Sequence, residues 1–583
     1  MSYDLIIRNG TVVDGSGNPR RRADVGVVDG RVAAVGFLED ETATEEIDAT
    51  GRIVAPGIVD AHTHYDPQLT WDPYATASCF HGVTTVLAGN CGFSVSPCRT
   101  EDRDFFGGVF AQVEGMDPVA LSGIDWQFET FAEYLAAREG DLGVNMACYA
   151  AHCNIRRWVM GADASERAAT EDEVAQMVQM LGEAMEAGAA GLSSTHAPTH
   201  NDGDGRPVPS RLAETDELLA LATEVGRHQG GSISYLPLSA VGGITQEDMD
   251  LLIDIGQASR LPVIIQGLGA RSKVDAPTAS WEGAVQFLQQ AQDEGAAVYS
   301  LLLARPFDRP FTLLRGTNLY EGVPAWNDLL QLPVEERIAA LSDPATRDEL
   351  REAVENPNRD PDKGSTLPPP HWKVLFVGQV ARDENKDLEG ASIFDLAGAR
   401  GVTPADAMLD LALSEDLETE FRWITETRGW MKAVKTAQHN PHMLVGTSDG
   451  GAHLSRDDGS DYSTYFLRKW VLEEGEWSLE EGIRQMTLVP ASLLGFLDRG
   501  MIRPGFWADI MIFDTDEIMR PGTKELVADL PGGAERFQAR PNGIHATIVN
   551  GEPIVLDGKL TDRRPGRVVA PNRDHLPAGS RQV

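Results

Sequence analysis

Short apolar runs alternate with helical patterns through most of this 583-residue chain. The runs with the length and composition of buried strands are 53–60, 84–89, 144–150, 189–193, 232–235, 263–266, 297–303, 374–378 and 443–446. Helical patterns such as 171–187 and 215–229 separate them. A repeated strand-then-helix order predicts an α/β fold with parallel strands, and eight such units form a (β/α)8 TIM-like barrel. Because nine runs compete for eight positions, one of them belongs elsewhere.

The two ends of the chain share a different texture, with short β-like runs broken by Gly and Asp. In the first 58 residues, Asn9-Gly10, Asp14-Gly15 and Asp29-Gly30 are hairpin signals, because these residues tolerate positive φ. Similar runs return at 508–514 and 546–555. We therefore expect residues 1–58 and 500–583 to form one small composite β-sandwich domain, with the barrel of residues 59–499 inserted between them.

Residues 305–370 interrupt the strand and helix alternation with a helix-rich, Pro-punctuated insertion. The plainer interpretation is a solvated excursion from the barrel. Long insertions on barrels also form lids over a binding site, so the lid stays open as an alternative.

The formal net charge of -39 constrains the partners of this chain. Such an excess of Asp and Glu repels phosphate backbones and anionic lipid, so we expect no nucleic acid and no membrane partner. The start of the chain has no basic and apolar signal-like segment, and no apolar run reaches about 18 residues. Five cysteines are a sparse and odd-numbered set for so long a chain, which argues against a disulfide framework. This favours a reducing compartment, so we expect a cytoplasmic protein. The sequence leaves a homo-oligomer open.

Metal-competent side chains follow several of the expected strands. His62 and His64 follow the run 53–60, Cys91 follows 84–89, His152 follows 144–150, and Asp449 follows 443–446. Residues i and i+2 of a strand point the same way, so His62 and His64 could hold one metal ion together. A barrel places its chemistry at the carboxyl ends of its strands. The shared position of these residues therefore predicts a metal site.

Each of these residues also has an ordinary structural interpretation. Cys91 could be a small buried apolar group, Asp449 a turn former before glycine, and His152 a hydrogen-bonded core histidine. Their common placement favours the metal site. Imidazole, thiolate and carboxylate together suit a borderline-soft divalent ion, and zinc is the expected ion.

The motifs that carry this site resemble those of the amidohydrolase superfamily, and within it the N-acyl-D-amino-acid deacylase (D-aminoacylase) group. The matching segments are PGIVDAHTH at 56–64, HGVTTV at 81–86, GNCG at 89–92, SDG at 448–450 and GMIRPGFWADIMIFD at 500–514. The resemblance implies a metal-dependent hydrolase of amide bonds. It implies that His62, His64 and Cys91 hold metal, and that Asp449 is both a ligand and the proton shuttle for a metal-activated water.

The sequence departs from the group at the fifth and sixth strands, where D-aminoacylases supply two further histidines. The corresponding segments, 231–237 and 262–269, contain none. We therefore expect one ion rather than two, held by His62, His64, Cys91 and Asp449. Further metal or substrate contacts could come from His152, His196, His200, Tyr235 and Gln266. His442 and His453, which flank Asp449, are interpreted as solvated loop residues.

An acylated amino acid carries a carboxylate, for which arginine is the natural bidentate partner. Arg456 is the first candidate, followed by Arg206, Arg211 and Arg305. Each of the four could equally form an ordinary surface ion pair.

Three functions remain in view. The first is deacylation of N-acyl-D-amino acids, a small-molecule amide substrate. The second keeps the fold but hydrolyses a cyclic amide or another C–N or ester bond, because fold does not settle substrate. The third is an inactive barrel that serves as a binding protein, which the missing histidines favour and the retained His62, His64, Cys91 and Asp449 oppose.

Overall fold

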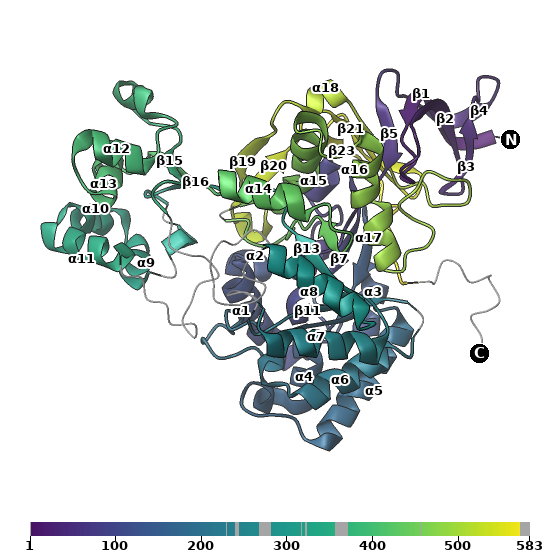
Figure 1. Ribbon diagram of the computed structural model, residues 1–583, viewed down its shortest axis with the longest axis horizontal. Helices are drawn as coiled ribbons and strands as arrows, with labels where there is room; N and C mark the ends of the chain where they lie inside the picture. The colour runs from purple at the N-terminus through teal and green to yellow at the C-terminus, as the bar shows by residue number, and fades with distance from the viewer. Residues whose placement is uncertain are drawn as a thin grey trace. The chain divides into compact units, whose positions relative to one another are not determined.

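The computed structural model describes residues 2–228, 230–239, 244–266, 281–315, 317–320, 323–355, 371–455 and 457–571 (Figure 1). The chain divides into two compact units. The larger comprises Met1–Arg305, Ala433–Leu454 and Asp458–Val583, and the smaller comprises Pro306–Lys432 and Ser455–Asp457. Among the described residues, no helix combines the length and the apolar character that a membrane crossing requires.

Strands from both ends of the chain pair in one nine-stranded sheet, in the order β23-β22-β21-β18-β5-β1-β2-β3, with β4 against β1. Its strands are β1 (Ser2–Val12), β2 (Arg21–Val28), β3 (Arg31–Gly36), β4 (Thr42–Asp48), β5 (Ile53–Pro56), β18 (Ile510–Phe513), β21 (Ile544–Val549), β22 (Glu552–Leu556) and β23 (Lys559–Leu560). The antiparallel pairing of β5 with β18 joins the two ends. Leu5, Val25 and Ile510 belong to the apolar core on this sheet.

One detail of the N-terminal strands differs from the prediction. Asn9-Gly10 does not form a hairpin but lies inside β1, where the register with β2 shifts and Asn9 has φ 61°. A bulge accepts the same positive-φ residues as a tight turn, so the dipeptide could not distinguish them. Asp29-Gly30 does connect two antiparallel strands, β2 and β3, with φ 50° and 73°.

Parallel strands build the middle of the larger unit. They are β6 (Ile58–Asp60), β7 (Val83–Ala88), β8 (Asn145–Cys148), β9 (Ala150–Ala151), β10 (Gly191–Thr195), β11 (Ser232–Leu236), β12 (Val263–Gln266), β13 (Val298–Leu302) and β17 (Met443–Val445). Pairing runs β6-β7-β8 and β9-β10-β11-β12-β13-β17, and only Tyr149 separates β8 from β9. Beyond the ends of β6 and β17, Thr63 forms a parallel bridge with Gly450. The strands therefore follow chain order, as the alternation predicted.

Helices connect these strands, and the principal ones are α1 (Arg103–Glu114), α3 (Phe131–Arg138), α4 (His152–Met160), α5 (Glu171–Ala187), α6 (Thr215–Val225), α7 (Gln246–Ser259), α8 (Trp281–Asp293), α16 (Leu479–Met486) and α17 (Leu488–Leu493). Helix α5 has the predicted bounds because both ends carry stop signals. Thr170 and Glu173 form a capping box, and Gly188 ends the helix in the left-handed region. Buried Met177 and Leu181 lie on its inward face.

The smaller unit has its own sheet and core. Its antiparallel strands β14 (Asp308–Thr312), β16 (Glu420–Ile424) and β15 (Leu375–Val377) accompany helices α9 (Pro324–Leu330), α10 (Val334–Ser342), α11 (Pro344–Glu355), α12 (Ile393–Arg400) and α13 (Pro404–Ser414). Trp326 is fully buried and stacks on Tyr320 at 4.5 Å between ring centroids. The insertion predicted at 305–370 lies mostly in this unit, and its residues 356–370 lie outside the described residues.

The smaller unit contains the one run, of the nine expected parallel strands, that does not belong to the parallel series. The run 374–378, predicted as one of the parallel strands, forms β15 and pairs antiparallel with β16. Its short apolar pattern suits a buried strand in either kind of sheet, so periodicity alone could not assign it.

A buried network of polar side chains connects β8 to the nine-stranded sheet formed by both chain ends, called here the terminal sheet. Asp509, 3% exposed, forms an ion pair with Arg499 and accepts hydrogen bonds from Asn145 Nδ2 at 3.2 Å and from the Asn550 backbone N–H at 2.8 Å. Asn145 lies in β8, and Asn550 follows β21. The carboxylate therefore ties together residues that are distant in sequence.

We expect Asp509→Ala to lower the free energy of unfolding by about 3–5 kcal/mol, because it removes the buried carboxylate that faces Arg499. Urea denaturation measures this loss. The matched control is Asp383→Ala, whose side chain is fully exposed, and which should change stability by less than about 0.5 kcal/mol. Equal effects of the two substitutions would contradict a structural role for the network.

Candidate metal centre

The His-x-His segment lies at the carboxyl end of β6, directly against the segment that follows β17. The backbone N–H of His64 donates to the Gly450 carbonyl at 2.7 Å, and that of Asp449 donates to the His62 carbonyl at 3.2 Å. Both imidazoles are buried, and their ring centroids are 5.2 Å apart. The first and last strands of the parallel series thus bring the histidines and Asp449 to one place.

Cys91 reaches the same place from the carboxyl end of β7. It occupies a short turn, Asn90–Gly92 (η3), in the left-handed region with φ 56°. The Asn90 side chain fixes this turn by donating to the Leu87 carbonyl at 2.8 Å and to the Thr63 carbonyl at 3.3 Å. A Cβ at Gly92 would lie 3.0 Å from Ser194 Cα, which explains why glycine follows the cysteine so closely.

The four residues expected to hold metal do converge. Cys91 Sγ lies 3.6 Å from His62 Nε2, and Asp449 Oδ1 lies 3.7 Å from His62 Nε2 and 3.4 Å from His64 Nε2. Ligands at 2.0–2.3 Å from a tetrahedral metal ion are separated from one another by about 3.3–3.7 Å. One ligand atom from each of His62, His64 and Cys91 lies within 4.8 Å of the others, which fits a shared divalent cation, and Asp449 contacts both histidines beside them.

The hydrogen bonding of the two histidines also fits a cation. Among the described residues, none forms a hydrogen bond with His64 Nδ1, His64 Nε2 or His62 Nδ1, although all three atoms are buried. Leaving buried polar atoms without partners is costly unless something else satisfies them. Burial lowers the pKa of His62 to about 3, which keeps its imidazole neutral, as metal ligation requires.

Cys91 and His64 have pKa shifts that a bound cation would offset. Burial raises the pKa of the Cys91 thiol to about 12. Burial favours neutral His64, but the charges of Glu114, Cys91 and Asp449 outweigh it and raise the His64 pKa well above its ordinary value. The site thus gathers anionic groups around a buried imidazole, an arrangement that favours a positive charge.

Glu114 joins the site without any signal in the sequence. It is the last residue of α1, is 3% exposed, and places Oε1 3.4 Å from His64 Nε2. One ligand atom from each of His64, Glu114 and Asp449 lies within 4.8 Å of the others. A single glutamate before a glycine at a helix end is too common for the sequence to distinguish it.

His453, interpreted as a solvated loop histidine, is instead part of the site. Its Nε2 lies 3.7 Å from Asp449 Oδ2 and 3.8 Å from Glu114 Oε2, and its side chain is 18% exposed. The interpretation was wrong because the loop turns back after Gly451, which has φ 88°, and His453 itself has φ 56°. The other flanking histidine, His442, belongs to neither group of potential ligands.

Asp449 has the properties of a proton-transfer group. Its side chain is 41% exposed, whereas His62 and His64 are buried. Burial alone would raise the pKa of Asp449, but contact with His64 and the charges of His453 and His62 bring it below its ordinary value. Asp449 is therefore a carboxylate at neutral pH and can accept a proton. Asp60, in contrast, is fully buried, and burial raises its pKa to about 7.

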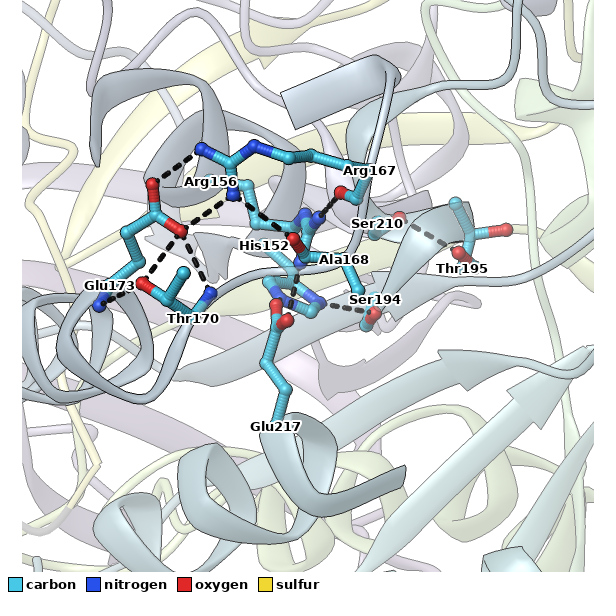
Figure 2. A network of polar contacts seen from close by, with 10 residues as sticks. All are labelled: His152, Arg156, Arg167, Ala168, Thr170, Glu173, Ser194, Thr195, Ser210 and Glu217. Atoms are coloured by element: carbon cyan, nitrogen blue, oxygen red, sulfur yellow. Dashed lines mark hydrogen bonds and ion pairs between the residues drawn. The ribbon is translucent and has the colours of Figure 1, made fainter. Parts of the chain in front are cut away.

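His152 lies in a separate buried network, which Figure 2 shows. Its Nε2 contacts Glu217 Oε1 at 2.7 Å and its Nδ1 contacts Ser194 Oγ at 2.8 Å, while Arg156 forms an ion pair with Glu217. Both ring nitrogens are thus taken by protein groups, and His152 belongs to neither group of potential metal ligands. The network joins α4, β10 and α6.

The remaining polar candidates follow β10, β11 and β12. His196 Nδ1 lies 2.9 Å from the hydroxyl of Tyr235, and burial lowers the pKa of His196 to about 4. His200 Nδ1 lies 3.0 Å from Thr195 Oγ1. Burial and the charge of His64 lower the His200 pKa to about 3. The His200 ring lies 5.9 Å from that of Phe93, which stacks on His64 at 6.1 Å. Gln266 ends β12 and is half-buried.

The candidate arginines differ in what they already bind. Arg206 pairs with Asp202 and Asp204, and buried Arg305 pairs with Asp461 at 2.5 Å. Arg211 donates to Asn201 Oδ1 at 2.5 Å and to the His200 carbonyl at 3.3 Å, which places it beside His200. Arg456 lies outside the described residues.

Comparison with known proteins gives consistent matches over nearly the whole chain. An amidohydrolase family model matches residues 45–555. A D-aminoacylase of Alcaligenes xylosoxydans xylosoxydans is 28% identical over 97% of this chain and 98% of its own. An uncharacterised protein of Mycobacterium tuberculosis is 30% identical over 96% of this chain and 93% of its own.

Solved structures share the fold. The crystal structure of a D-aminoacylase matches with a TM-score of 0.61 and 22% identity, over 97% of this chain and 100% of its own. N-acyl-D-glutamate deacylase from Bordetella bronchiseptica, complexed with zinc and a phosphonate inhibitor, matches with a TM-score of 0.61 and 24% identity, over 97% and 99%.

We expect the double substitution His62→Ala and His64→Ala to abolish cation binding, because it removes both buried imidazoles from the four converging side chains. Elemental analysis of zinc-reconstituted protein measures the result. The control is His545→Ala, which lies in β21 of the terminal sheet and should leave the metal content unchanged. Stoichiometric zinc in the double variant would place the ion elsewhere.

Proposed function

The chain belongs to the amidohydrolase family, and from that premise we propose that it hydrolyses N-acyl-D-amino acids. As a member, it is a metal-dependent hydrolase of carbon–nitrogen bonds other than peptide bonds. The observation that carries the proposal is the convergence of His62, His64, Cys91 and Asp449 within 3.4–3.7 Å contacts. We further infer that the eight parallel strands close into a (β/α)8 barrel at the bridge between Thr63 and Gly450.

We infer that these four side chains hold one divalent cation, with zinc the preferred ion because thiolate and imidazole suit it. Tyr235 lies in β11 and Gln266 ends β12, the strands where D-aminoacylases supply histidines, so a second ion of the usual kind lacks its ligands. When bound, such a cation lowers the pKa of a coordinated water towards about 7 and polarises a carbonyl oxygen.

Asp449 supplies the proton transfers. As a carboxylate that is partly open to solvent, it accepts the proton of the attacking water and then delivers it to the leaving amine. Its backbone is held from both sides, since its own N–H donates to the His62 carbonyl and its carbonyl accepts from Ala452 at 3.0 Å. The carboxylate therefore keeps its position relative to His62 and His64 during the reaction.

The substrate class follows from the relatives. The two named relatives act on acylated D-amino acids by their names, and the similarity covers nearly all of this chain. Such substrates carry a carboxylate, and we assign its binding to Arg211. Arg211 donates to the carbonyl of His200, whose ring packs against Phe93, and Phe93 in turn stacks on His64.

Steady-state assays on paired N-acetyl-D- and N-acetyl-L-amino acids test the proposal, with cyclic amides as the alternative substrates. We expect hydrolysis of the D-enantiomers, loss of activity on complete chelation, and recovery with zinc. Hydrolysis of cyclic amides without any hydrolysis of acyl-D-amino acids would contradict the proposed substrate and favour a cyclic-amide hydrolase. Activity that survives complete metal removal would overturn the mechanism.

We expect Asp449→Asn to lower kcat by about 100- to 10,000-fold, because an amide cannot accept the proton of the attacking water. The metal content, measured in the same samples, separates loss of the proton shuttle from loss of the cation. The control is Asp557→Asn, which makes the same change at an exposed side chain. Unchanged kcat in a metal-loaded Asp449→Asn variant would assign the proton transfer to another group.

A further inference from the structure

A second group of potential ligands also contains His64. One ligand atom from each of His64, Glu114 and Asp449 lies within 4.8 Å of the others, and His453 borders the two carboxylates. His64 Nε2 is 3.4 Å from Glu114 Oε1 and from Asp449 Oδ1, and His453 Nε2 is 3.8 Å from Glu114 Oε2 and 3.7 Å from Asp449 Oδ2. These contacts form a closed ring of two imidazoles and two carboxylates. The contacts of His64 with the two carboxylates are as short as those between ligands of one tetrahedral cation, about 3.3–3.7 Å, and His453 lies near the other oxygen of each carboxylate.

The backbone holds this ring in place. The N–H of His453 donates to the carbonyl of Glu114 at 2.6 Å, so the end of α1 and the Asp449 loop are fixed against each other. Gly115, with φ 60°, follows Glu114, and a Cβ at that position would lie 3.4 Å from His453 Nδ1. The positive φ at Gly115 ends α1 directly after Glu114.

The buried His64 ring supplies an independent sign of a ligand. It is fully buried, and no described residue forms a hydrogen bond with Nε2, the atom that faces both carboxylates. Glu114 is also buried, with a side chain that is 4% exposed. A buried imidazole nitrogen between two carboxylates is stabilised by a shared cation or proton.

We propose that His64, Glu114, Asp449 and His453 form a second cation position that shares His64 and Asp449 with the thiolate position. A neutral imidazole offers one lone pair, so His64 binds one ion at a time and the two positions compete. This inference rests on the proposed metal-dependent function, because both positions belong to the same site.

The two positions differ in ligand chemistry. His62 and Cys91 make the first position soft, with a thiolate that suits zinc and cadmium. Glu114 and His453 make the second position harder, since it offers two carboxylates and no sulfur, which suits Mn²⁺. The identity of the added ion should therefore decide which of the two cation positions it occupies.

Titration of the metal-stripped full chain with Mn²⁺ or Cd²⁺ alone tests the proposal. Electron paramagnetic resonance reports Mn²⁺ binding, and thiolate charge-transfer absorption reports Cd²⁺ at Cys91. We expect Glu114→Gln and His453→Asn to weaken Mn²⁺ binding by more than about tenfold while leaving Cd²⁺ affinity within about threefold. Cys91→Ser should show the reverse selectivity and lose the absorption band.

Two matched controls accompany these variants. His545→Asn changes a histidine whose side chain is 18% exposed, as that of His453 is. Cys148→Ser changes another buried cysteine, which lies in β8. We expect both controls to bind both ions as the unchanged chain does. His453→Asn keeps the test usable if Glu114→Gln fails to fold.

Three results would overturn the proposal. They are unchanged Mn²⁺ affinity in Glu114→Gln and His453→Asn, equal weakening of both ions in every variant, and simultaneous binding of Mn²⁺ and Cd²⁺ to one chain. Displacement of Mn²⁺ by Cd²⁺ at one ion per chain supports it. The titrations do not involve substrate, so failure to hydrolyse acyl-D-amino acids would contradict the proposed function and leave this result standing.

Discussion

The site depends on the backbone pairing between the segments that follow β6 and β17. Hydrogen bonds from His64 N–H to the Gly450 carbonyl and from Asp449 N–H to the His62 carbonyl join residues nearly 390 positions apart, since Thr63 pairs with Gly450. Backbone bonds of this kind leave little freedom to the side chains that they carry. The distances of 3.4–3.7 Å between the ligands are thus a consequence of strand pairing, before any ion is bound.

The loops that carry the ligands share one backbone feature. Cys91, Asp449 and His453 all have φ 56°, in the left-handed region that side chains other than glycine rarely adopt. Such residues cost about 1–3 kcal/mol each and persist where the surroundings hold them, often at functional sites. Here the surroundings are Asn90, Ser448 and the backbone of Glu114. These turns present Cys91 from the loop after β7, and Asp449 and His453 from the loop after β17.

The site clusters acidic groups in a chain that is already strongly negative, which is electrostatically unfavourable. Asp449, Glu114 and Cys91 gather against His62 and His64 in a chain whose formal charge is already -39. A divalent cation would relieve the repulsion among these groups and satisfy the buried imidazoles. A strongly acidic chain can keep acidic groups clustered and buried where a cation neutralises them.

The sequence by itself determined the order of the parallel strands, the return of the β texture at both ends, and the position of His62, His64, Cys91 and Asp449 just beyond the ends of parallel strands. These follow from local periodicity and from the rule that strand ends meet on one side. It could not identify 374–378 as an antiparallel strand, because a short apolar run fits either sheet. Only the tertiary structure brought Glu114 and His453 to the site. Their positions depend on where a helix ends and where a loop turns back, and those positions are set by packing between distant segments.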